Sequence, residues 1–101
     1  MGINLHWQGE RGDLLDHVLD ERGLTKHLVA AAQEDSVCLR FVDLYGDTVF
    51  NQLQIPVLLE EIRAVAASSL SQEAIAHREE IVKLVREAQG RVHTYLKFTG
   101  D

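Results

Sequence analysis

The sequence predicts an α+β fold: a small antiparallel or mixed sheet of roughly three to five strands, with two main helices packed on one face. Near both ends of the chain, apolar and polar residues alternate, as in strands with one buried face. In the second half, two longer stretches repeat apolar residues with helical spacing. The length of 101 residues fits a single α+β domain, residues 1–101.

The first predicted strand covers residues 3–8. It places three apolar side chains on one face and three polar ones on the other: Ile3, Leu5 and Trp7 against Asn4, His6 and Gln8. Gly9 and Gly12 then mark a turn.

Residues 13–22 fit two interpretations. The spacing of their leucines and valine favours a short helix, with Asp13 as N-cap and Gly23 just past the end. A second strand after the glycine turn is the alternative, and it decides the size of the sheet. Residues 24–35 then predict a further short helix, with Thr25 as its N-cap.

Residues 37–50 predict a hairpin. Val37–Val42 alternates as one strand, Gly46 lies in the turn, and Thr48–Phe50 is rich in strand-forming residues. Asp43 and Asp47 flank this turn, so their carboxylates could share a cation or a proton. The ligand pattern of a calcium loop is missing, and aspartate is common in turns, which favours a simple turn.

The two main helices and a last strand follow. Residues 55–70 form the first helix, with Pro56 in its first turn and an inward stripe of Ile55, Leu58, Leu59, Ile62, Val65 and Ala66. Ser71 is the predicted N-cap of the second helix, residues 72–89, and Gly90 its stop signal. Residues 91–98 close the chain as a strand that faces Val92, Thr94, Leu96 and Phe98 inward.

Composition narrows the classes of function. The net charge of −6 disfavours nucleic-acid and membrane-surface partners, because phosphates and anionic lipids repel an acidic protein. The single cysteine, Cys38, excludes an intrachain disulfide and indicates a reducing compartment. The N-terminus is short and polar, unlike a signal peptide, so we expect a cytoplasmic protein.

Few residues have the spacing of a chemical site. The five histidines include no H-x-x-x-H pair, and Cys38 has no cysteine or histidine nearby in the sequence, so we expect neither a metal nor a cofactor. Cys38 as a nucleophile would need an electropositive setting, and a buried thiol is the simpler interpretation. The candidates for ligand binding are polar residues of the predicted open sheet face: His6, Arg40, His93 and Tyr95, beside Lys97.

We therefore expect a protein–protein interaction or regulatory module without catalytic activity, which self-associates as a homodimer. Ala64 and Ala67 lie off the main stripe of their helix, where small side chains permit close packing on another helix. Alanine is also simply a good helix former. The alternative function is a small ligand-binding protein or enzyme that uses the open sheet face.

Overall fold

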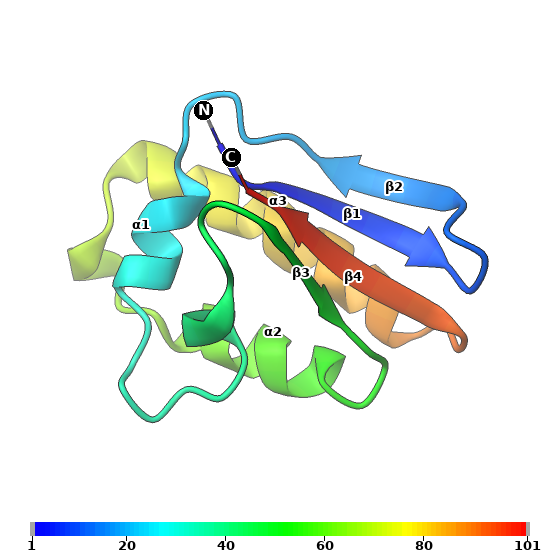
Figure 1. Ribbon diagram of the computed structural model, residues 1–101. Coiled ribbons are helices and arrows are strands. Elements are labelled where there is room, and N and C mark those ends of the chain that lie inside the picture. Colours follow the sequence, from blue (N-terminus) through cyan, green and yellow to red (C-terminus); the bar gives the residue numbers. More distant parts are fainter. Residues whose placement is uncertain (1, 101) are drawn as a thin grey trace.

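The computed structural model describes residues 2–100, in which four strands form one antiparallel sheet in the order β2-β1-β4-β3 (Figure 1). The strands are β1 (Asn4–Gly9), β2 (Leu14–Val18), β3 (Asp47–Phe50) and β4 (Thr94–Thr99). The helices are α1 (Thr25–Ala30), α2 (Ile55–Ala64) and α3 (Gln72–Gln89), with 3-10 turns η1 (Leu39–Phe41) and η2 (Ala67–Ser69). The α+β class is confirmed.

The core lies between the sheet and the helices. The longest helix, α3, crosses one face of the sheet, and α1 and α2 pack beside it (Figure 1). The alternation of the central strands explains this layering, because Leu5 of β1 and Leu96 and Phe98 of β4 are all buried towards the helices. The opposite face of the sheet stays open.

Helix α3 begins and ends where the sequence predicts. The hydroxyl of Ser71 accepts a hydrogen bond from the Ala74 N–H (3.1 Å), which satisfies one free amide of the first turn. The inward stripe is buried as expected: Ile81, Leu84, Val85 and Ala88. None of the helices described in residues 2–100 has the length and hydrophobicity that a membrane crossing requires.

Helix α2 begins at Ile55, with Pro56 in its first turn, but it is shorter than predicted and ends at Ala64. Val65 is extended (φ −63°, ψ 124°), its side chain is buried, and its carbonyl accepts a hydrogen bond from the Arg78 guanidinium of α3. The helix stops because these tertiary contacts replace the next helical turn. Ala66, predicted to face inward, is exposed.

Residues 13–22 are not a helix, so the favoured interpretation is wrong and the strand alternative is correct. Gly9 donates to the Asp13 carbonyl (2.8 Å), and Gly12 donates to the Gly9 carbonyl (3.0 Å). Gly12 has φ +84°, a left-handed conformation that glycine adopts without strain. This tight turn brings β2 antiparallel to β1, and Asp13 caps no helix.

The first strand of the hairpin predicted at Val37–Val42 is also wrong. That segment holds η1, because the Glu61 carboxylate of α2 accepts from three successive N–H groups, those of Val37 (2.6 Å), Cys38 (3.0 Å) and Leu39 (2.9 Å). Amides held by a carboxylate are not free to pair in a sheet. The second strand is confirmed as β3, which pairs with β4.

Two terminal assignments also differ from the prediction. Thr25 is the first residue of α1 rather than its N-cap, which is Leu24. β4 begins at Thr94, since His93 has φ +60°, and Val92 before it is 62% exposed rather than buried.

Candidate functional site

The structure brings together only two of the four predicted ligand-binding residues. On the open face, His6 lies opposite Lys97, and Tyr95 lies opposite Gln8 on the same pair of strands. Arg40 is in η1, which packs against α1 and α2, and its guanidinium lies over the Phe41 ring.

His93 precedes β4 and is exposed. Its N–H donates to the Gln52 side chain (3.2 Å). Arg40 and His93 therefore lie outside the four strands, and only His6 and Tyr95 lie on the open sheet face as predicted.

A third group on the open face comes from β2. His17 lies directly opposite His6, with ring centroids 6.4 Å apart, so His17, His6 and Lys97 form a row across three strands. The pKa of His6 is lowered, chiefly by burial and then by the positive charges of His17 and Lys97. Asp47 forms an ion pair with Lys97 (3.3 Å) and opposes this shift.

Metal ligands do not converge in the described structure. Within residues 2–100, no three His, Cys, Asp or Glu side chains are placed to hold a metal ion. The two aspartates of the turn have separate roles: Asp43 accepts from the Tyr45 N–H (2.9 Å), as in a turn, while Asp47 pairs with Lys97.

A buried polar cluster joins Asp20, Thr25 and His77. The Asp20 carboxylate accepts from three backbone amides: those of Ile3 (2.9 Å), Leu24 (2.7 Å) and Thr25 (3.1 Å). Burial alone would raise the pKa of Asp20, but these amides and His77 outweigh it and lower the pKa. The cluster ties the start of β1 to the start of α1.

The geometry of this cluster is structural rather than catalytic. The Thr25 hydroxyl donates to the Ile3 carbonyl (3.2 Å), so it accepts from Nε2–H of His77 (2.8 Å). Asp20 lies 3.5 Å from the same ring nitrogen. A nucleophile–histidine–aspartate relay uses both ring nitrogens, whereas here one nitrogen serves both partners.

Cys38 is buried, and its thiol faces the Gln54 carbonyl (4.0 Å). Burial, followed by the negative charge of Glu61, raises the pKa of this thiol. A raised pKa keeps the sulfur protonated, and a protonated thiol is a poor nucleophile. These contacts support the interpretation of Cys38 as a core side chain.

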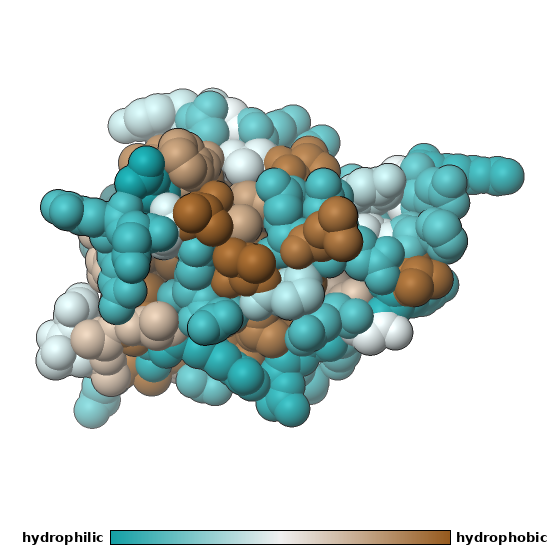
Figure 2. All heavy atoms as spheres, turned by 90° about the horizontal axis from the view of Figure 1, so that it is seen from below, coloured by the Kyte–Doolittle hydropathy of each residue, from teal (hydrophilic) through white to brown (hydrophobic). Residues whose placement is uncertain are grey.

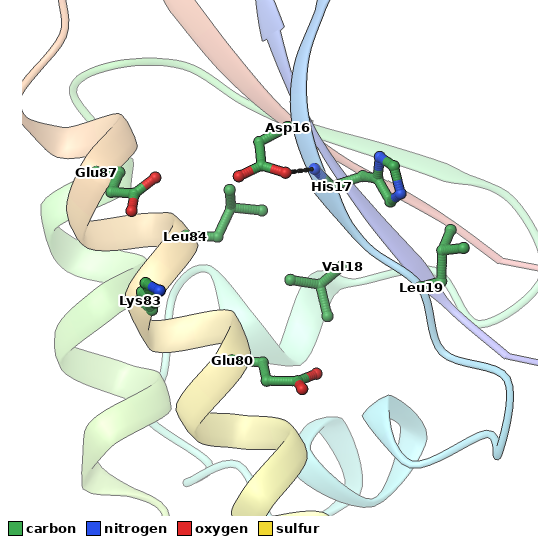
Figure 3. A pocket seen from close by; sticks show the side chains of 8 residues that line it. All are labelled: Asp16, His17, Val18, Leu19, Glu80, Lys83, Leu84 and Glu87. Atoms are coloured by element: carbon green, nitrogen blue, oxygen red, sulfur yellow. Dashed lines mark hydrogen bonds between the residues drawn. The ribbon is translucent and has the colours of Figure 1, made fainter.

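A groove of about 370 Å³ lies between the edge strand β2 and helix α3 (Figure 3). We call it the β2–α3 groove, and these residues line it: Asp16, His17, Val18, Leu19, Glu80, Lys83, Leu84 and Glu87. Asp16 and Val18 point from β2 towards α3, while His17 points away (Figure 3). The groove thus combines apolar side chains with three carboxylates and one ammonium group.

Apolar side chains also gather on the face of the molecule that carries α2 and η1 (Figure 2). We define the α2 face by five residues: Val37, Phe41, Leu53, Val57 and Ala64. Leu53 is 86% exposed, Val37 63% and Phe41 60%. Several large apolar side chains this exposed are typical of an interaction surface.

Comparisons with known proteins add no family to this description. A scan against protein-family models found no match, and searches of curated proteins and of solved structures returned none either. The function therefore has to be inferred from the surfaces of the chain itself.

Proposed function

We propose that the protein is a cytoplasmic protein–protein interaction or regulatory module, without catalytic activity, that self-associates through the α2 face. The observation that carries the proposal is the exposure of Leu53 and Val57. Leu53, 86% exposed, lies two residues before α2, and Val57, 37% exposed, lies in the first turn of α2 outside its buried stripe. Ala64 also lies outside this stripe, where a small side chain lets a second helix approach closely.

The charges on the α2 face favour a second copy as the occupant. Glu60 and Arg63 are both exposed, and neither forms an ion pair within residues 2–100. In an antiparallel pair of α2 helices that cross between these positions, Glu60 of one copy lies opposite Arg63 of the other. A two-fold axis generates this attraction twice, so the surface is complementary to itself.

The proposed interface has to extend beyond α2 itself. A stable interface buries about 800 Å² from each partner. The ten residues of α2 span about 15 Å, which is too little alone. The segment with Val37 and Phe41 packs beside α2 and widens the apolar area.

The experiment is to measure molecular mass by size-exclusion chromatography with light scattering. Val57→Glu places an unpaired charge in the proposed interface and should convert a dimer to a monomer. Val92→Glu is the matched control, because Val92 is also exposed but lies outside the α2 face. A wild-type monomer, or equal loss of mass in both variants, would contradict the proposal.

The alternative is a ligand-binding role for the open sheet face. The observation that favours it is the row of His17, His6 and Lys97, which gathers three groups able to carry positive charge on an acidic protein. Titration with inorganic phosphate, followed by NMR, tests it. Saturable shifts at His6 and Tyr95 would support it, and no shift would exclude it for anions.

A further inference from the structure

The β2–α3 groove borders an unpaired strand edge. β2 is the last strand of the sheet on its side, so its outer backbone groups meet no other strand of residues 2–100. Helix α3 runs alongside but leaves a hollow between itself and β2 (Figure 3). An extended polypeptide that pairs with β2 would direct every second side chain into this hollow.

The charge of the groove indicates which kind of strand would bind there. The lining holds three carboxylates, those of Asp16, Glu80 and Glu87, and one ammonium group, that of Lys83. It therefore carries an excess of two negative charges. None of the three carboxylates forms an ion pair within the described chain. Between them, Val18 and Leu84 supply an apolar floor.

We propose that the β2–α3 groove binds an extended segment of another protein that carries basic, apolar and basic side chains in turn on one face. The proposal does not depend on self-association, because the β2–α3 groove and the α2 face share no residue.

The spacing of the groove matches this pattern. Glu80 and Glu87 are two helical turns apart, about 10.5 Å along α3. Alternate basic residues on one face of a strand, with one apolar residue between them, are about 13.6 Å apart. Lysine and arginine side chains are long and flexible, so they reach both carboxylates although the two spacings differ. The middle side chain rests on Leu84 and Val18.

A second copy of the chain does not fit as the occupant. Two β2 edges paired together would bring two Asp16 carboxylates close, and an inward-pointing charge of this kind disfavours edge-to-edge pairing. The segment of this chain in which basic residues alternate, with Arg91, His93 and Lys97, runs into β4, which already pairs with β1 and β3. The basic strand must come from another protein.

The test uses the whole protein and two fluorescein-labelled peptides of the same composition. The first, acetyl-Thr-Lys-Thr-Val-Thr-Lys-Thr-amide, places both lysines and the valine on one face of a strand. The second, acetyl-Thr-Lys-Val-Thr-Lys-Thr-Thr-amide, divides the lysines between the two faces. We expect saturable fluorescence anisotropy with the first peptide, weakening as salt rises, and clearly weaker binding of the second.

Protein variants locate the binding. Glu80→Gln together with Glu87→Gln should weaken binding of the first peptide about fivefold. Glu34→Gln with Glu79→Gln removes the same charge outside the groove and should leave binding unchanged. Three results would overturn the proposal: no binding up to about 1 mM peptide, equal binding of both peptides, or equal weakening by both pairs of substitutions.

Discussion

His77 Nε2 lies 3.5 Å from the Asp20 carboxylate, and the two side chains are only 6% and 1% exposed. This contact joins α3 to the loop between β2 and α1. The same carboxylate accepts the Ile3 N–H at the start of β1, so one aspartate connects three parts of the fold. Because a buried charge that loses its partners is costly, changing one residue of the cluster should destabilise the fold.

Asp20→Asn should lower the free energy of unfolding by about 3 kcal/mol at pH 7, because it removes a buried charge that holds three backbone amides. Urea denaturation followed by circular dichroism measures the change. Asp35→Asn, at an exposed aspartate, is the control and should change little. A loss below about 0.5 kcal/mol for Asp20→Asn would contradict the role given to the cluster.

The same substitution predicts a pH dependence. Because the folded state lowers the pKa of Asp20, its stabilisation is present above the ordinary aspartate pKa and is lost as pH falls through the lowered pKa. The stability difference between wild type and Asp20→Asn should therefore be constant from neutral pH to about pH 4 and shrink below it. A difference that already shrinks between pH 7 and pH 5 would be inconsistent with a lowered pKa.

His6 should titrate below the ordinary histidine range in an NMR pH series. Replacing His17 with Gln removes one positive neighbour and should raise the pKa of His6, though not fully, because burial is the larger cause. His27→Gln, at an exposed histidine of α1, should have no effect. Since the folded state disfavours protonated His6, its contribution lowers stability as pH falls below about 6.5. An unchanged pKa in His17→Gln would show that the rings do not interact.

Cys38 should react slowly with Ellman's reagent in the native protein at pH 8 and quickly in urea. The buried thiol has a raised pKa, so little thiolate is present, and access requires opening of the fold. Rapid reaction of the native protein would mean that the segment around Cys38 is open or its thiol activated.

Glu61→Ala should destabilise the protein by about 2 kcal/mol, because three backbone amides lose their acceptor at once. Glu79→Ala removes an exposed glutamate of α3 and serves as control. Hydrogen exchange at Val37 and Leu39 should become faster in Glu61→Ala. Unchanged exchange would show that other contacts hold this segment.

Regular periodicity explains which elements could be predicted. Residues 3–8 and 94–98 alternate cleanly, and 72–89 has one continuous apolar stripe and a serine cap, so local sequence and tertiary packing agree. The helix assigned to residues 13–22 failed because the register of β2 shifts opposite Trp7 and Gln8, which breaks the alternation expected of a strand. At Val37–Leu39, a carboxylate 22 to 24 positions away decides the structure.

The candidate sites could be predicted only where the strands and helices that carry them were predicted correctly. His6 and Tyr95 were placed correctly on the open face, since their strands were. The place of His17 on the open face and the β2–α3 groove both depend on residues 14–18 forming an edge strand. The favoured interpretation of these residues as a helix could not predict either feature. The contacts of Asp20 with Ile3 and His77 join distant positions, and no local pattern in one sequence encodes such contacts.

Self-association through the α2 face is the central claim, and sedimentation velocity of charge-exchanged variants tests it most directly. Wild type should sediment as a dimer, Glu60→Arg and Arg63→Glu alone should each weaken the dimer, and the double variant should restore it, because the exchanged charges again lie opposite each other across the two-fold axis. A monomeric wild type, or a double variant no more dimeric than the single ones, would contradict the account.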